Sequence, residues 1–138
     1  MLVYRRDDKP GIPWPGLVDL PGGGREGSES PVQCALRELH EEFGLNIPEQ
    51  RIVWARPFPS LHPPGRIGWM LALPLTAAEV AAIVFGDEGR DPQLLEIGAF
   101  LAAPDGVAPL QDRVRQLMES AHLHAVLKYH TGKTSLFP

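Results

Sequence analysis

Apolar residues between positions 32 and 43 recur at the three- and four-residue spacing of an α-helix, forming one stripe made of Val32, Ala35, Leu36, Leu39 and Phe43. Ser30 is a suitable N-cap, and Gln33 completes a capping box with it. Pro31 suits the first helical position, and Gly44 can end the helix in a left-handed conformation. The pattern predicts a helix over residues 31–43 whose apolar stripe packs on a sheet.

Shorter apolar runs elsewhere predict strands, separated by loops rich in glycine and proline. The predicted strands cover residues 2–5, 17–20, 51–58, 68–75 and 94–97. Trp69 lies inside the continuous apolar run of the fourth of these, so we expect its side chain in the core.

Two more helices are predicted in the second half of the chain. Thr76 opens a second capping box and predicts a short helix over residues 76–85, followed by a polar loop over residues 85–92. Residues 110–130 contain no glycine or proline and have apolar residues at helical spacing, which predicts one long or kinked helix. Residues 131–138 are expected to form a loose tail.

The length of the chain predicts a single domain over residues 1–138. A chain of 138 residues suits one domain and can bury about two-thirds of its unfolded surface. Its 43% hydrophobic and 22% charged residues are typical of soluble globular proteins, and we find no internal repeat.

Acidic residues cluster on one side of the first predicted helix. Glu38, Glu41 and Glu42 stand three and four positions apart and therefore share one face. Like charges at this spacing cost about 0.2–0.5 kcal/mol per pair, and only Arg37 is near enough in sequence to offset them. A glycine-rich turn at residues 20–24 precedes the helix. Clustered acids beside an irregular backbone suggest a site for a hard divalent cation and the phosphates that accompany it.

The same segment resembles a known family. From Gly23, five residues lead to Glu29 and seven more to Arg37, and then comes the run Glu38-Leu39-x-Glu41-Glu42-x-Gly44-Leu45. This spacing resembles the signature box of the Nudix hydrolases at every defined position. The resemblance implies an α/β/α sandwich with a mixed sheet. It also implies Mg²⁺- or Mn²⁺-dependent hydrolysis of a diphosphate linked to a nucleoside or a similar group.

Family members usually carry one more strand before the one that ends here at Arg5, so the first family strand is expected to be missing from this sequence or supplied in another way. The resemblance assigns Glu38, Glu41 and Glu42 as metal ligands, together with the backbone carbonyl of Gly23. Glu41, between the other two, is expected to be the most critical ligand.

Arg37 is expected to orient a neighbouring carboxylate. The general base is either a box glutamate or a residue of a later loop, where Glu88 is the first candidate and Asp87 the second. An ordinary exposed acidic loop remains an equal alternative for this segment. Arg6 and Arg25 are candidates for binding substrate phosphates, with simple surface solvation as the alternative for each.

Composition excludes several kinds of protein. The net charge of −4 argues against binding to polymeric nucleic acid or anionic membranes. A single cysteine excludes an internal disulfide and a cysteine-based zinc site. No apolar run approaches membrane-spanning length and no signal peptide opens the chain, so a cytoplasmic protein is expected. The apolar C-terminal helix could support a homodimer, although packing on its own sheet explains it more simply.

The substrate stays open between a nucleoside diphosphate linked to another group and a nucleoside triphosphate, with the MutT-like subgroup weakly favoured by the short chain. Two other classes are weighed. One is a non-catalytic Nudix-fold module that binds a nucleotide or nucleotide sugar, against which the complete set of box acids counts. The other is a related prenyl diphosphate isomerase, which needs a cysteine outside the box. The one cysteine here, Cys34, lies inside it.

Overall fold

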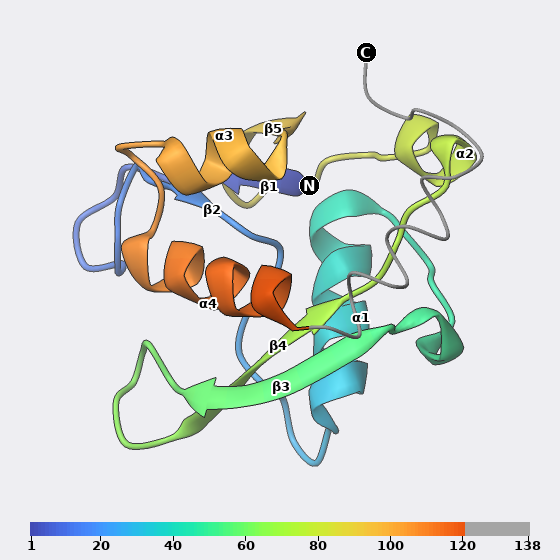
Figure 1. Ribbon diagram of the computed structural model, residues 1–138, viewed down its shortest axis with the longest axis horizontal. Coiled ribbons are helices and arrows are strands. Elements are labelled where there is room, and N and C mark those ends of the chain that lie inside the picture. Colours follow the sequence, from blue (N-terminus) through green and yellow to red (C-terminus); the bar gives the residue numbers. More distant parts are fainter. Residues whose placement is uncertain (121–138) are drawn as a thin grey trace.

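The computed structural model describes residues 1–120 of the protein (Figure 1). Its strands are β1 (Leu2–Arg5), β2 (Val18–Asp19), β3 (Trp54–Pro59), β4 (Ile67–Ala72) and β5 (Arg90–Leu94). Its helices are α1 (Pro31–Phe43), the 3₁₀-helix η1 (Glu49–Arg51), α2 (Ala77–Ala81), α3 (Ile97–Ala102) and α4 (Ala108–Glu119). The predicted tail at residues 131–138 lies outside the described residues.

The described strands form two antiparallel sheets. The first has the order β2-β1-β5, and the second is the hairpin of β3 and β4. Across the first sheet, Tyr4 pairs with Asp19 and Leu2 pairs with Leu94. A single parallel bridge joins Val18 to Gly106. Strand β1 therefore pairs with β2, which follows it after a long loop, and with β5, which is distant in sequence.

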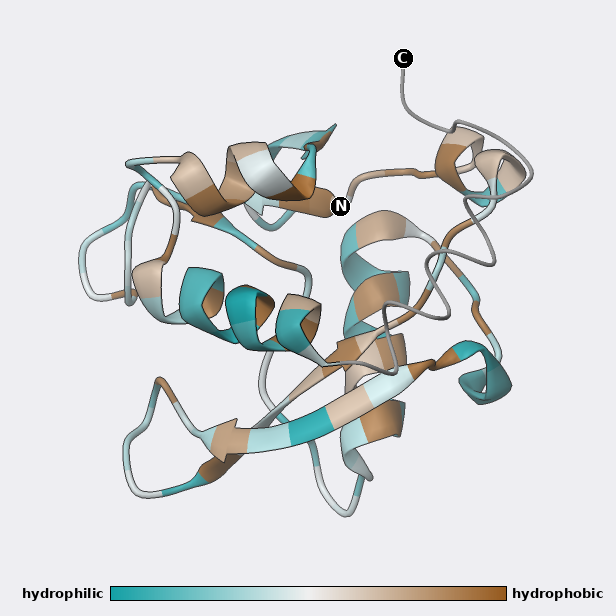
Figure 2. Ribbon diagram, in the orientation of Figure 1, coloured by the Kyte–Doolittle hydropathy of each residue, from teal (hydrophilic) through white to brown (hydrophobic). Residues whose placement is uncertain are grey.

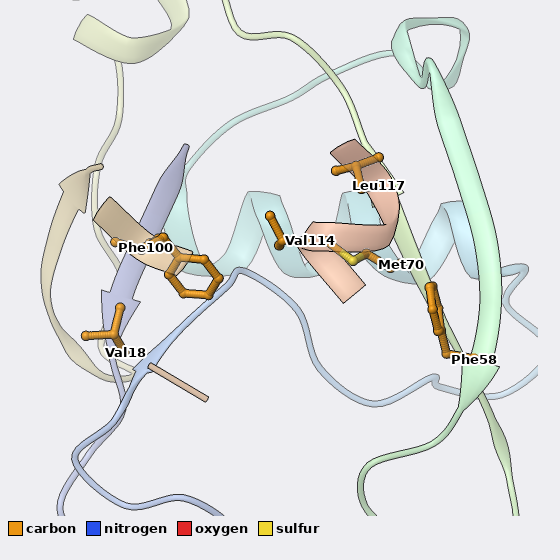
Figure 3. Close-up of a cluster of buried hydrophobic side chains, with 7 residues drawn as sticks. Val18, Phe58, Met70, Phe100, Val114 and Leu117 are labelled. Atoms are coloured by element: carbon orange, nitrogen blue, oxygen red, sulfur yellow. The ribbon is translucent and has the colours of Figure 1, made fainter. Parts of the chain in front are cut away.

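Successive residues of β1 face two different cores, because side chains alternate across a strand. Val3 belongs to a cluster that contains Phe100, Val114 and Leu117 of α3 and α4, together with Phe58 and Met70 of the hairpin (Figure 3). Tyr4 belongs to a second cluster formed with α1 and the segment after it, with Leu39, Phe43, Leu45 and Ile47. The first sheet is thus covered by α3 and α4 on one face and by α1 on the other (Figure 1).

Helix α1 has the bounds and caps that the sequence predicts. The Ser30 side chain accepts a hydrogen bond from the Gln33 N–H at 3.1 Å, and the Gln33 side chain accepts one from the Ser30 N–H at 2.8 Å. Gly44 ends the helix with φ +68°, a value that favours glycine. Hydrophobic and hydrophilic residues alternate around the helix, as Figure 2 shows, and the apolar ones enter the second core.

The predicted strand at residues 94–97 is wrong. Strand β5 lies earlier, at Arg90–Leu94, so it includes residues that the sequence placed in a loop. Every residue of β5 is exposed, and pairing with β1 rather than apolar burial selects this segment. Residues from Ile97 to Ala102 then form helix α3, which buries Phe100.

The hairpin also departs from expectation. The side chain of Trp69 is not in the core, because the residue is 44% exposed. Its position on β4 pairs with Pro57 on β3, and Ile67 on the same side pairs with Pro59. The other side of the hairpin carries Phe58 and Met70 into the first core.

Helix α4 packs into the first core of the same chain through Val114 and Leu117. This agrees with the simpler explanation of its apolar face, which is packing within the chain. The continuous helix ends at Glu119, and the remainder of the predicted helix at residues 110–130 lies outside the described part of the chain. Helix α2 has the predicted capping box of Thr76 and Glu79. Among residues 1–120, no helix has the length and apolar character that crossing a membrane requires.

Candidate functional site

The glycine-rich turn at residues 20–24 touches the acidic face of α1 at two points. The Gly22 N–H donates a hydrogen bond to the Glu42 carboxylate, with an N···O distance of 2.9 Å. The Gly23 backbone lies so close to Glu38 that a Cβ at this position would stand 2.4 Å from Glu38 Oε1. A side chain at Gly23 would therefore displace the Glu38 carboxylate from its present position, and the two acids lie against one stretch of backbone.

Arg37 connects three acids of the box through hydrogen bonds. Its guanidinium donates to Glu29 at 2.8 Å, to Glu38 at 3.0 Å and to Glu41 at 2.8 Å. A further bond from Nη2 reaches the Gly24 carbonyl at 2.8 Å. These bonds, the one to Glu29 most of all, raise the pKa of Arg37. The same contact lowers the pKa of Glu29. Arg37 thus orients the neighbouring carboxylates, and Glu29 anchors Arg37.

The three box acids differ in environment. The Glu41 side chain is 55% exposed, whereas Glu42 is buried. Burial raises the pKa of Glu42 to about 8, against the opposing effect of the Gly22 N–H, and the charge of Glu38 raises it further. Burial also raises the pKa of Glu38, and the Arg37 contact opposes this. The anionic form of either Glu38 or Glu42 would be stabilised by a nearby cation.

The donor set suits a hard divalent cation. Carboxylates and the backbone carbonyl of Gly23 offer oxygen atoms alone, which Mg²⁺ and Mn²⁺ prefer. At its defined positions the box holds four acids and one arginine, and three of the acids, Glu29, Glu38 and Glu41, pair with the Arg37 guanidinium. Across residues 1–120, however, no three acidic, histidine or cysteine side chains already stand as a metal cluster. The reason is local: Glu38 and Glu41 are turned toward Arg37 and would have to turn from it to bind metal.

The segment that contains Glu88 runs along the C-terminal end of α1. Val84 N–H donates to the Phe43 carbonyl at 3.1 Å, and Gly86 N–H donates to the Glu42 carbonyl at 2.8 Å. The charge of Glu88 contributes to the raised pKa of both Glu38 and Glu42. The later loop therefore brings this exposed carboxylate to the same side of the molecule as the box.

A cleft of about 350 Å³ lies beside this loop. Its wall combines cations, acids and apolar groups from β1, the following loop and the Glu88 loop: Tyr4, Arg6, Asp7, Lys9, Ile12, Asp87, Glu88 and Gly89. Arg6 is held there by the buried Asp19, with a distance of 2.6 Å between Arg6 Nη1 and Asp19 Oδ2. The structure thus brings Arg6 and Glu88 to one cleft.

Arg25 does not line this cleft. It is exposed in the loop before α1, where its charge acts on Glu29. Cys34 is buried, and its Sγ lies 3.9 Å from the Gly23 carbonyl oxygen. Sequence reasoning missed Asp19 and Tyr4. An acid inside an otherwise apolar predicted strand is a signal of a buried partner, but nothing local identifies Arg6 as that partner.

Comparison with known proteins identifies the family. The family model described as the NUDIX domain matches residues 1–106, which is more than half of the chain. The MutT protein of Methanosarcina mazei Go1 is similar in structure, with a TM-score of 0.65 and 21% identity over 86% of this chain and 85% of that one.

Two longer proteins are similar over only part of their length. A MutT/nudix family protein from Enterococcus faecalis has a TM-score of 0.53 and 23% identity over 67% of this chain and 34% of that chain. A bifunctional NMN adenylyltransferase/ADP ribose pyrophosphatase from Francisella tularensis has a TM-score of 0.57 and 19% identity over 86% of this chain and 37% of that chain. The fold class predicted from the resemblance is confirmed, and the chain belongs to the Nudix family of pyrophosphohydrolases.

Proposed function

We propose that the protein is a divalent-metal-dependent hydrolase that cleaves a diphosphate linkage in a nucleoside diphosphate linked to another group or in a nucleoside triphosphate. The observation that carries this proposal is the meeting of two box acids with one stretch of backbone, where Glu42 accepts from Gly22 and Glu38 lies against Gly23. A diphosphate is rich in negative charge, and an acidic site accepts it only together with cations.

Glu38, Glu41, Glu42 and the Gly23 carbonyl would hold Mg²⁺ or Mn²⁺. Such an ion, when bound, neutralises the phosphate oxygens and orients them for in-line attack. A structure of the Francisella tularensis protein is described as a complex with AMP and Mn ion, which agrees with this choice of metal and ligand for that relative. Arg37 is fixed by its bonds to Glu29 and Gly24 and lies beside the carboxylates that would hold the ion.

In the reaction, the oxygen of a water molecule forms a bond to one phosphorus while the bond from that phosphorus to the bridging oxygen breaks. The bridging oxygen leaves with the other phosphate. Glu88 accepts a proton from the attacking water, and its position beside the box supports this role. Arg6 binds substrate phosphate in the cleft, and Arg25 does so from the loop before α1.

The test is release of phosphate-containing products from a panel of nucleoside triphosphates, nucleotide sugars, ADP-ribose and dinucleotides, with and without Mg²⁺. We expect turnover of one substrate class that requires the cation. If no member is hydrolysed while nucleotides still raise the melting temperature, the hydrolase proposal fails and a nucleotide-binding module takes its place.

A further inference from the structure

One charged side chain in the first sheet is buried and is not part of the box. Asp19 is 7% exposed and lies on β2, opposite Tyr4 of β1. Its Oδ1 accepts the N–H of Leu20 at 2.7 Å, and its Oδ2 accepts Arg6 Nη1 at 2.6 Å. A buried carboxylate with a single cationic partner fixes that partner strongly, because either charge alone would be costly there.

The contact uses one particular end of the Arg6 guanidinium. Only Nη1 donates to Asp19, and within residues 1–120 the Nε and Nη2 atoms have no hydrogen-bond partner. The Nε atom is also buried, so water does not satisfy it. An unpaired buried donor is unfavourable, and a small turn of the guanidinium toward the cleft would give it an acceptor there.

The unpaired edge has the geometry of an anion site. Nε–H and the adjacent Nη2–H point in parallel and match two oxygens of a phosphate, a bidentate pairing that lysine cannot make. Arg6 lines the cleft that also contains Glu88. The backbone supports this placement, since the Arg6 N–H donates to the Leu17 carbonyl at 2.9 Å and ties the end of β1 to the strand before the glycine-rich turn.

We propose that Asp19 is a positioning residue, which holds Arg6 by Nη1 so that the Nε–Nη2 edge receives two oxygens of a substrate phosphate. This rests on the proposed function, in which Arg6 binds the substrate, and adds the residue and the geometry that make it do so. Asp19 itself does not touch the substrate.

The experiment compares four variants with the wild type: Asp19→Asn, Arg6→Lys, Arg6→Gln and the double variant of Asp19→Asn with Arg6→Gln. Asp105→Asn is the matched control, because Asp105 pairs with Arg5, the neighbour of Arg6, at 2.7 Å, and neither lines the cleft. Melting temperatures confirm that each variant is folded. Steady-state kinetics with Mg²⁺ and the substrate found in the panel separate KM from kcat.

Asp19→Asn should raise KM about 10-fold and change kcat by less than about twofold, since it weakens a charge-assisted contact to bound substrate and leaves the box intact. Arg6→Lys should raise KM nearly as much, because a point charge cannot replace the fork. The double variant should be no worse than Arg6→Gln alone, as expected of a residue that acts through another. Asp105→Asn should leave KM unchanged.

A binding measurement separates this proposal from the hydrolase proposal. Titration calorimetry with inorganic pyrophosphate and Mg²⁺ should give a Kd that Asp19→Asn weakens about 10-fold, with or without any turnover. If the wild type turns over substrate and Asp19→Asn alters neither KM nor this Kd, Asp19 has no positioning role. The same holds if the Asp19→Asn and Arg6→Gln effects add in the double variant. A wild type that neither hydrolyses the panel nor binds pyrophosphate overturns both proposals.

Discussion

Helix α1 and the segment from residue 85 to residue 102 both bring acids to the site, but they are held in different ways. The caps of α1 come from Ser30 and Gly44 at its own ends, and Arg37 ties its acids together from inside the helix. The later segment depends on distant partners: Gly86 donates to Glu42, and β5 pairs with β1.

Because they are held differently, the box and the later segment are expected to contribute to activity in different ways. The acids of the box are held by hydrogen bonds among residues 22–42. Glu88 stands in an exposed loop whose two attachment points, Gly86 and Gly89, are glycines pressed against other residues. A Cβ at Gly86 would stand 2.6 Å from the Glu41 carbonyl oxygen, and one at Gly89 would stand 2.4 Å from the Tyr4 ring. We therefore expect substitutions in the box to remove activity directly. The loop should affect activity through the position in which it holds Glu88.

The largest effect is expected from Glu41→Gln. If Glu41 holds the metal as proposed, its loss removes several kcal/mol of charge stabilisation in the transition state, which corresponds to a fall in kcat/KM of about 10⁴-fold. The side chain is 55% exposed and its ion pair with Arg37 is a surface one, so stability should change by less than about 1 kcal/mol.

The assay for this variant is product release under Mg²⁺, with the melting temperature measured in parallel. Glu49→Gln, an exposed acid of η1, is the matched control and should behave as wild type. A Glu41→Gln protein that retained more than a tenth of wild-type activity would remove Glu41 from the ligand set.

Glu88→Gln tests the loop. If Glu88 accepts the proton, turnover should fall by about 10²–10⁴-fold. Asp87→Asn is the matched control, since Asp87 is the neighbouring acid of the same cleft, and should retain most activity. Should Asp87→Asn be the inactive variant, the roles of the two acids are exchanged.

Glu42 should make the free energy of unfolding depend on pH. Its folded pKa of about 8 lies above its ordinary 4.5, so the folded state binds this proton more tightly than the unfolded state. The stabilising contribution is full below about pH 4.5 and is lost as the pH rises through about 8. In protein freed of metal by a chelator, Glu42→Gln should raise the free energy of unfolding at pH 9 by about 1–3 kcal/mol, because it removes a buried charge.

Urea unfolding of both proteins from pH 4 to pH 9 measures the Glu42 effect, with chelator present throughout. The wild-type curve should decline with rising pH and the Glu42→Gln curve should be flatter. Two parallel curves would show that Glu42 titrates normally in the fold.

The smallest effect is expected far from the site, at Glu79. Hydrogen bonds from Arg51 and from the Thr76 N–H lower its pKa to about 2. Its contribution to stability is present above the ordinary pKa of 4.5 and is lost as the pH falls toward about 2. Glu79→Gln should lower the melting temperature slightly at pH 7 and not at pH 2, with Glu119→Gln as a neutral comparison. Kinetic constants at pH 7 should not change.

The same contrast explains what could be predicted from the sequence. The bounds of α1 and the residues of the box follow from signals within 23 positions, such as the Ser30 cap and the spacing from Gly23 to Leu45. Strand β5 and helix α3 were missed because β5 is wholly exposed and gains its structure by pairing with β1, about 90 residues earlier in the chain. Trp69 was misplaced because an apolar run does not reveal which side of a hairpin is covered.

Asp19 illustrates the limit for site residues. Its partner Arg6 is 13 positions away and meets it only because β1 and β2 pair in the observed register. The ion pairs of Arg37 with Glu38 and Glu41 could be predicted from their spacings of one and four residues. The ion pair of Arg6 with Asp19 could not.

The most direct test of the account is the position of the metal. Crystals of the protein soaked with MnCl₂ and a non-hydrolysable diphosphate substrate analogue would be measured at a wavelength where manganese scatters anomalously. An anomalous peak is expected beside the Gly23 carbonyl, contacted by the carboxylates of Glu38, Glu41 and Glu42, with Arg37 still bonded to Glu29. Manganese bound elsewhere, or analogue bound in the cleft with no manganese at the box, would contradict it.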